Sequence, residues 1–374
     1  MIWTKNRGRR QTPGVTVDLG PLVDHHCHGL VVEDLDRAGF EALMNEGARP
    51  SPLGTTLFDS MLGLAIRRHC APLLDLETLA TADEYLARRT ALGSAEVNRR
   101  MVAAAGIEEF LVDTGLTPEK VCTPDDLAGL AGGAGREVVR LERIAEEVLA
   151  AGTADFPGEV RQRLEVSRAV GAKSIAAYRV GLALPATKPT SAQLDKALAG
   201  VRPARIASMT VSAWLAHTAI ELGLPLQFHV GYGDSELDLL ACDPLRLTDF
   251  LRATEERGVP VLLLHNYPYH RNAAYLAQVF DHVFMDLGLA VHNSGAASAA
   301  IVRETLELVP FGKLLFSSDA YGLAELYLLA AVLFRDGLGG ALADLVAAGD
   351  MTAGDASYVA GLVARDNARR VYRL

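Results

Sequence analysis

Short apolar runs alternate with longer, helix-like stretches along this chain of 374 residues. Eight runs are predicted to be strands, because each is rich in aliphatic or branched residues and is bounded by Gly, Pro or polar residues. They cover residues 22–27, 109–113, 137–141, 172–177, 225–230, 260–265, 282–287 and 313–318. Strands that alternate with helices form a parallel sheet, and eight such units predict an α/β protein with a closed (β/α)₈ TIM barrel. A doubly wound open sheet is the rival topology, but it would spread the strand ends along a line.

The connection between the first two predicted strands is too long for an ordinary loop between a strand and a helix. It covers about residues 30–106 and contains a helix-like stretch at 82–92 that follows the cap residue Thr81. We therefore expect a helical insertion over the mouth of the barrel, where the loops after the strands shape substrate pockets. A shorter insertion is expected at 185–210. The whole chain, 1–374, is expected to form one domain that includes both.

The charge of the chain argues against a nucleic-acid partner. The formal net charge is -10, and the Lys and Arg residues cluster only at 5–10, whereas phosphate binding needs clustered basic residues. We interpret 5–10 as a solvated arm. No apolar stretch of about 15 residues follows it, so a secretory signal is not expected.

Two further features bear on the setting of the protein. The apolar segment 321–334 is interrupted by Glu325 and is shorter than the ~20 residues that a membrane helix needs, so we predict a buried helix and no membrane partner. Part of this segment, 326–334, could equally form an interface in a homo-oligomer. The four cysteines are widely spaced and form no C-x-x-C pair, which favours a reduced, cytoplasmic setting.

Five of the predicted strands contain or end in residues that can bind a metal. In chain order these are His26 and His28, Lys173, His229, His265 and Asp319. The C-terminal ends of parallel barrel strands open on one face, so residues nearly 300 positions apart can meet around one ion. His26 and His28 are two positions apart on a strand and therefore point to the same side, about 6.5 Å apart along the backbone. By the same alternation, we expect His25 and Cys27 to face away from them.

A divalent metal is the predicted cofactor. Such an ion lowers the pKa of a bound water from about 15.7 toward 7 and so makes a nucleophile at neutral pH. Asp319 would bind the ion and accept the proton of this water, although an aspartate at this position could also simply cap the next helix. Zinc is the default for an imidazole-rich site with a carboxylate, and manganese or iron would fit the same ligands.

Lys173 leaves the number of ions open. An ammonium group has no lone pair for a metal, so a ligand role requires that CO₂ carboxylates the amine to a carbamate that can bridge two ions. Alternatively, Lys173 pairs with an acidic neighbour. The site would then hold one ion through His26, His28, His229 and Asp319, and His265 would polarise the substrate.

Several polar residues close to the strand ends are candidates for substrate binding. Arg179 could bind a substrate carboxylate through two parallel hydrogen bonds, and Tyr178 could stabilise the oxyanion of a tetrahedral intermediate. Both could also be residues of the rim without a role. His270 and Arg271 follow the sixth predicted strand and His292 follows the seventh, so we expect them to line the pocket.

The pattern D-x-H-x-H at residues 24–28, followed by the lysine, two isolated histidines and a late aspartate, resembles the amidohydrolase superfamily of metal-dependent (β/α)₈ hydrolases. K-x-x-x-A-Y-R at 173–179 is similar to the strand of hydantoinase-type members that carries a carboxylated lysine. Residues 229–247, 262–289 and 314–338 resemble the amidohydrolase domain that is fused to glutamine synthetase in FluG- and nodulin-type proteins. This resemblance implies hydrolysis of γ-glutamyl amides. The loop DAYGLAE at 319–325 lacks the proline that is expected before its glutamate.

The sequence therefore predicts a cytoplasmic amidohydrolase that cleaves an amide C–N bond of a small-molecule substrate, with Asp319 and His265 as catalytic residues. Three alternatives remain at this point. A decarboxylase of an aromatic acid and a lactonase would both use the same ion. A barrel that has kept its fold and lost turnover would only bind its ligand.

Overall fold

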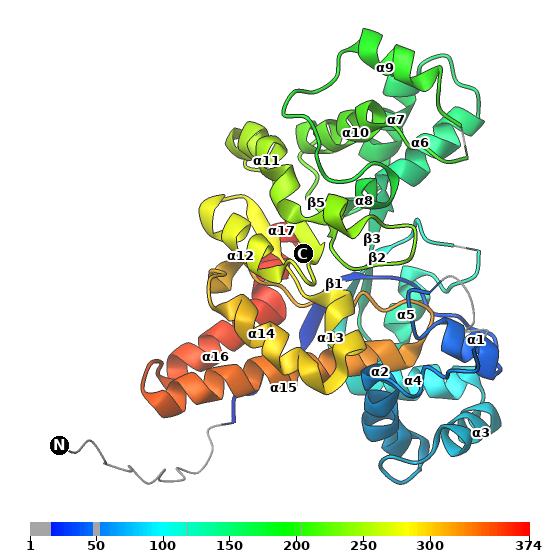
Figure 1. Cartoon of the computed structure of the whole chain (residues 1–374), viewed down its shortest axis with the longest axis vertical. Helices are drawn as coiled ribbons and strands as arrows, with labels where there is room; N and C mark the ends of the chain where they lie inside the picture. The colour runs from blue at the N-terminus through cyan, green and yellow to red at the C-terminus, as the bar shows by residue number, and fades with distance from the viewer. Residues whose placement is uncertain (1–15, 48–52, 118, 203) are drawn as a thin grey trace.

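Seven parallel strands form a single sheet in the computed structural model, which describes residues 16–47, 53–117, 119–202 and 204–374 (Figure 1). The predicted basic arm at 5–10 lies outside these ranges. Each strand pairs with the next one along the chain. The strands are β1 (Leu22–Cys27), β2 (Ile107–Asp113), β3 (Ala134–Arg140), β4 (Gly171–Ser174), β5 (Leu226–Val230), β6 (Val261–His265) and β7 (Val283–Met285).

The sheet closes through residues 314–319, which lie between β7 and β1. The backbone N–H of Leu315 donates to the carbonyl of Met285 at 3.0 Å on one side, and that of Asp319 donates to His26 at 3.0 Å on the other. The eighth strand is thus an extended segment that is bonded to both neighbours, although the bonds are too sparse for a regular ladder. The predicted (β/α)₈ barrel is confirmed.

Most strand bounds differ from the prediction by one or two residues, and those of β3 and β4 differ by three residues at one end. β4 ends at Ser174, because the chain turns into the short helix α8 (Ala176–Arg179) where the sequence predicted a strand as far as 177. β3 begins at Ala134, three residues before the predicted start. Its first residues follow the αL cap of the preceding helix at Gly132, so the chain is already extended there.

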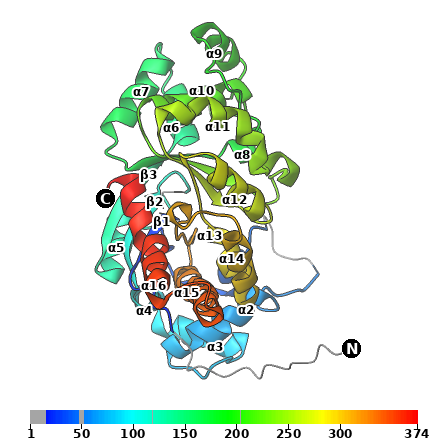
Figure 2. The same cartoon turned by 90° about the vertical axis from the view of Figure 1, so that its left-hand side faces the viewer.

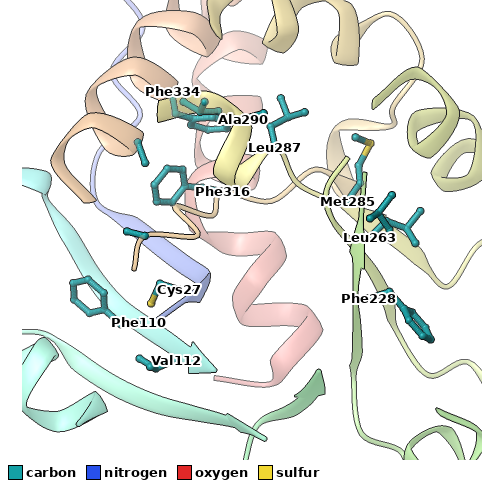
Figure 3. Close-up of a cluster of buried hydrophobic side chains, with 14 of the residues drawn as sticks. Cys27, Phe110, Val112, Phe228, Leu263, Met285, Leu287, Ala290, Phe316 and Phe334 are labelled. Carbon is teal, nitrogen blue, oxygen red and sulfur yellow. The ribbon is translucent and has the colours of Figure 1, made fainter. Parts of the chain in front are cut away.

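Side chains of the strands alternate between two cores. The inner core lies within the barrel and contains Val23, Leu111, Val138, Leu262, Leu264, Phe284 and Leu315, together with Ala368, Val371 and Tyr372 of the C-terminal helix. The outer core lies between the strands and the helices, and Figure 3 shows part of it, with Cys27 beside Phe110 and Val112. Cys27 therefore faces outward, as predicted. His25, however, lies inside the barrel, because the pairing of β1 with β2 shifts between Asp24 and Cys27 and breaks the alternation.

A helical segment separates β1 from β2. It contains α1 (Arg37–Ala42), α2 (Met61–Ala65), a π-helical turn (Ile66–Cys70), a 3₁₀ turn (Ala71–Leu74), α3 (Ala82–Leu92) and α4 (Ser94–Ala105). Thr81 is the N-cap of α3, where its side chain and that of Glu84 form a capping box. Figure 1 shows these helices at one end of the molecule. The buried carboxylate of Glu325 accepts hydrogen bonds from Tyr85 and Arg89, both at 2.9 Å, and so links α3 to the barrel.

The predicted buried helix is longer than the sequence suggested. α15 runs over Ala324–Ala348 and packs against α4, α13 and α14; in Figure 2 it lies between α14 and α16. Among the described residues it is the one helix that is long and apolar enough to cross a membrane. However, 72% of its most apolar window is buried inside the protein, as in the core helix of a globular protein.

The remaining helices complete the outer layer, except for the C-terminal helix, which contributes to the inner core. They are α5 (Pro124–Ala131), α6 (Leu141–Ala150), α7 (Phe156–Val166), α9 (Ser191–Leu198), α10 (Met209–Glu221), α11 (Thr248–Thr254), α12 (His270–Val279), α13 (Gly288–Ser294), α14 (Ser298–Leu306), α16 (Ala353–Gly361) and α17 (Asn367–Tyr372). Short 3₁₀ turns lie at Leu239–Cys242, Pro244–Leu247, Glu255–Arg257, Gly295–Ala297 and Phe311–Lys313, and a π-helical turn at Leu362–Asp366.

Candidate metal and substrate site

Three imidazoles surround the carboxylate of Asp319 at the C-terminal ends of the strands. Asp319 Oδ1 lies 3.1 Å from Nε2 of His26 and 3.3 Å from Nε2 of His28. Asp319 Oδ2 lies 3.2 Å from Nδ1 of His265 at the end of β6. The ring of His229 on β5 is next to that of His265, with the centroids 4.6 Å apart. The four histidines and the aspartate of the predicted ligand set thus meet at one place.

Hydrogen bonds made by Nδ1 of each ring leave the Nε2 atoms of His26 and His28 facing Asp319. Gln227 donates from Nε2 to the carbonyl of His25 at 2.9 Å, so its Oε1 accepts from His26 Nδ1, also at 2.9 Å. His28 Nδ1 donates to the carbonyl of Asp113 at 3.2 Å. Because each ring donates from Nδ1, a neutral ring carries its lone pair on Nε2, the atom that faces Asp319.

This arrangement fits a metal cation. Burial, together with the charge of Lys173, lowers the pKa of His26 to about 4, so its ring is neutral at pH 7. The lone pair of His26 faces an oxygen of the Asp319 carboxylate across 3.1 Å and repels it unless a cation lies between them. Neutral imidazoles and an ionised carboxylate are also the protonation states that a metal requires. The ligand atoms of His26, His265 and Asp319 lie within 4.8 Å of one another, close enough to share an ion.

A second group of ligand atoms includes a residue that the sequence analysis missed. Asp113, at the end of β2, lies with His26 and His28 in a cluster whose ligand atoms are within 4.8 Å of one another. Burial acts to raise the pKa of Asp113, but the charge and the hydrogen bond of Arg140 hold it well below its usual range. Arg140 Nη2 donates to its carboxylate at 2.6 Å. Since Asp113 ends a predicted strand, the rule that identified the other ligands could have identified it too.

The backbone at the end of β6 leaves the strand conformation to bring His265 to the site. Leu262 and Leu264 belong to the inner core, so strict alternation would direct His265 outward. A φ of 67° at His265 and of 61° at Asn266 turns the chain instead. Such left-handed conformations cost about 1 kcal/mol or more and are often found at functional sites. Asp286 stabilises the turn by accepting from the N–H of His265 at 2.7 Å.

Lys173 is buried next to the histidines. Its Nζ lies 3.3 Å from His26 Nε2, and the residue is 2% exposed. Burial lowers the pKa of Lys173 to about 8, so more of the amine is neutral at pH 7 than in an exposed lysine. Within the part of the chain that the structure describes, no carboxylate lies within ion-pair distance of Nζ, so the structure does not show the pairing with an acidic neighbour. Carboxylation of Lys173 remains a prediction.

A cavity of about 270 Å³ lies over these ligands. Tyr178 and Arg179 line it, as do Arg140 and Lys173. The ring of Tyr178 lies 4.5 Å from that of His229 between centroids. Arg179 Nη2 is 3.5 Å from Glu146, whereas its Nε has no hydrogen-bond partner among the described residues. The loop after β5 passes close to Tyr178, and this is possible because residue 233 is glycine. A Cβ at this position would lie 2.1 Å from the hydroxyl of Tyr178.

Two of the residues that we expected to line the pocket lie elsewhere. His270 begins α12, and its Nε2 is 2.8 Å from Glu304 of α14. Arg271 pairs with Glu307 at 3.1 Å. Both thus face α14 in the outer layer, and neither lines the cavity over the ligands, so the prediction was wrong for these two. The distance of a residue from the end of a strand does not determine whether its side chain, on the following helix, faces the mouth of the barrel. His292 lines a second cavity next to the first.

Buried polar residues behind the ligands form a connected network. Tyr372 of α17 lies with its hydroxyl 3.0 Å from His25 Nδ1 and accepts from Gln227 Nε2 at 2.7 Å. His25 Nε2 lies 2.8 Å from Asp286. The chain of contacts therefore runs from the C-terminal helix to His26 through Gln227, and to the backbone of His265 through Asp286. No motif in the sequence marks Gln227, Asp286 or Tyr372.

Sequence comparison assigns the chain to a family. The model of the amidohydrolase family matches residues 125–374, more than half of the chain. The chain belongs to the amidohydrolase family. Protein FluG of Emericella nidulans is 27% identical over 95% of this chain, which covers 46% of FluG. The chain therefore spans about half the length of this curated relative.

Solved structures of similar proteins support the same fold. A proposed metal-dependent hydrolase from Lactobacillus casei ATCC 334 is 30% identical, with 96% of each chain covered and a TM-score of 0.82. Uronate isomerase from Thermotoga maritima is 14% identical, with 94% of each chain covered and a TM-score of 0.64. At that identity the second likeness concerns the fold alone.

Proposed function

We propose that this amidohydrolase holds a divalent metal, most simply zinc, and hydrolyses an amide C–N bond of a small molecule such as a γ-glutamyl amide. One observation carries the proposal: the Nε2 lone pairs of His26 and His28 face the carboxylate of Asp319 below a cavity. The family and the similarity to a proposed metal-dependent hydrolase support the reaction class. The choice of γ-glutamyl amides follows from the resemblance of residues 229–247, 262–289 and 314–338 to FluG- and nodulin-type proteins.

Each ligand residue has a defined task in this proposal. His26, His28, His229 and Asp319 would hold the ion, and a carboxylated Lys173 would allow a second one. When bound, the ion supplies a water of lowered pKa and polarises the substrate carbonyl. Asp319 accepts the proton of the attacking water and returns it to the departing amine, a role that suits a carboxylate directly beside the reacting atoms. His265, 3.2 Å from Asp319 and close enough to share its ion, would also orient that carboxylate.

The cavity residues orient the substrate. The side chain of Arg179 is 12% exposed and lines the cavity, so its guanidinium fork can reach a substrate carboxylate. Burial raises the pKa of Tyr178, with the charges of Glu46 and Asp234 acting in the same direction, so its hydroxyl stays protonated. It can therefore donate a hydrogen bond to the developing oxyanion.

Turnover by metal-free and metal-loaded protein tests the proposal. Chelator-treated protein is reconstituted with Zn²⁺, Mn²⁺ or Fe²⁺ and assayed against γ-glutamyl amides, simple amides, a lactone and an aromatic carboxylic acid. Amide hydrolysis should require the metal. Asp319→Asn should lower kcat by about 10²- to 10⁴-fold, because the proton carrier is removed. Elemental analysis of the same samples separates loss of the ion from loss of proton transfer.

The matched control is Asp350→Asn, at an exposed aspartate in the turn after α15. It should retain wild-type kcat. Asp319→Asn with bound metal and near-normal turnover would remove the role that we assign to this carboxylate. Turnover of only the lactone or only the aromatic acid would replace amide hydrolysis as the reaction.

A further inference from the structure

The catalytic cavity continues into a second compartment. This compartment has a volume of about 320 Å³ and lies between the loop before α2, the loop after β5 and helix α13. Glu46, Asp234 and Asp319 line both cavities. The two spaces therefore form one pocket with Asp319 at their junction, and a substrate bound at Asp319 can extend into both.

The second compartment carries excess negative charge. Among its described lining residues are the carboxylates of Glu46, Asp234, Glu236 and Asp319, and no lysine or arginine. Two of these are already accounted for: Glu236 pairs with Arg205 at 2.9 Å, and Asp319 belongs to the metal ligands. Glu46 and Asp234 remain as carboxylates for a ligand. Burial, reinforced by the charges of Asp319 and Asp234, raises the pKa of Glu46 to about 7. The ionised carboxylate is therefore disfavoured, and a cation bound beside it would stabilise this form.

A buried histidine gives independent evidence of a ligand. His292 of α13 is 1% exposed and lines this compartment. Neither of its ring nitrogens makes a hydrogen bond of good geometry to a described residue, although the Ser318 backbone lies near the ring. Buried polar atoms nearly always form hydrogen bonds. An imidazole without them at the wall of a cavity therefore indicates a hydrogen-bond partner that binds in the cavity. A neutral imidazole offers one N–H donor and one lone pair as acceptor.

The rest of the wall is suited to a short alkyl chain. Leu43, Met44, Leu289 and Leu326 contribute apolar surface next to the charged residues. These apolar side chains would contact the methylene groups of an alkyl ammonium ion, and the carboxylates would bind its charge.

We propose that the second compartment binds an ammonium group that the substrate carries on a short alkyl chain, with Glu46 and Asp234 as counter-charges and His292 as hydrogen-bond acceptor. The inference rests on the proposed function insofar as the amide to be cleaved lies at Asp319. It restricts the substrates further, to amides whose cationic group lies on the part of the molecule that extends into the second compartment.

Binding of small probes tests this inference without turnover. The metal-loaded protein is titrated with n-butylammonium chloride, n-butanol and sodium butyrate, which differ mainly in the charge of the head group, and Kd is measured by ligand-observed NMR. We expect butylammonium to bind about 10-fold or more tightly than butanol, and butyrate to bind most weakly. Glu46→Gln and Asp234→Asn should each weaken butylammonium binding and leave butanol unchanged. His292→Phe should weaken both the amine and the alcohol, because each donates a hydrogen bond.

Asp350→Asn serves again as the control, and thermal denaturation confirms that each variant is folded. Metal content is measured after each titration, because an ammonium ion that displaced the metal would bind at the wrong place. Equal affinity for butanol and butylammonium, or unchanged amine binding in both carboxylate variants, would overturn the inference. Such a result combined with normal amide turnover removes this inference alone, whereas amine binding without turnover of any amide removes the proposed reaction alone.

Discussion

The tautomer of His26 depends on one amide side chain. Gln227 accepts from His26 Nδ1 at 2.9 Å, and its own orientation is fixed because its Nε2 donates to His25 and Tyr372. Removing this acceptor frees the ring to rotate or to carry its proton on Nε2, which a metal cannot use. We predict that Gln227→Leu weakens metal binding by about 10- to 100-fold, measured by competition with a chromogenic chelator.

A matched substitution on the surface separates this effect from a general loss of packing. Gln278→Leu changes an exposed glutamine of α12 in the same way and should leave metal affinity unchanged. Gln227→Glu, which keeps an acceptor oxygen, should recover most of the affinity. Wild-type affinity in Gln227→Leu would show that the ring of His26 is oriented by other contacts.

Single residues differ in how far the sequence predicts their place. His26, His28 and Asp319 follow apolar runs, so a barrel topology alone brings them together. Gln227 has no such mark, because its role arises from a partner on β1 that is 201 positions away in the chain. The strand pattern explains only in part why His265 lies next to Asp319, since its position also depends on a backbone turn at positive φ.

At the level of elements, one buried carboxylate joins the helical segment before β2 to the barrel. Glu325 of α15 is fully buried, and its Oε1 lies 2.9 Å from the Nε of Arg89 on α3. Without this carboxylate the guanidinium would be a buried, unpaired charge, and such a change typically costs about 3–5 kcal/mol. We predict that Glu325→Ala destabilises the protein by this order and lowers the midpoint of denaturant unfolding.

An exposed ion pair provides the comparison. Asp249 and Arg252 of α11 lie 3.0 Å apart, with side chains 76% and 65% exposed, so Asp249→Ala should hardly change the midpoint. The double variant Arg89→Met with Glu325→Ala should be more stable than Glu325→Ala, because it also removes the unpaired charge. If Glu325→Ala unfolds like wild type, α3 is held by its apolar contacts alone.

The elements themselves were largely predictable, because apolar runs with period-two alternation specify strands and capping residues specify helix starts. The eight predicted runs correspond to seven strands and the extended segment that closes the barrel. The end of β4 was not predictable: residues 175–177 are apolar and compatible with a strand, and tertiary contacts decide that α8 begins there. The far end of α15 was missed for a similar reason, since Gly337, Gly339 and Gly340 suggest a break that packing against neighbouring helices overrides.

For the whole molecule, the number of buried imidazoles decides how stability responds to acid. Burial lowers the pKa of His26 and His292 to about 4, and lowers that of His229 and His265 well below the usual value of 6.5. Between pH 6.5 and 4, the unfolded chain therefore binds protons that the folded chain does not, so stability is lost as the pH falls. Each such ring contributes about 1.4 kcal/mol per pH unit.

Three buried carboxylates act in the opposite direction, because burial also raises the pKa of Glu142, but the imidazoles outweigh them. Burial raises the pKa of Asp24 to about 8 and that of Glu46 to about 7, so their folded forms keep protons that the unfolded chain releases. Four rings against three carboxylates leave a net loss of stability. We predict that the Tm of chelator-treated protein falls steadily from pH 6.5 to pH 4.5. His292→Asn should make this fall shallower without touching a metal ligand. A Tm that is constant over this range would mean that the buried rings are already protonated, and protonated rings could not serve as metal ligands.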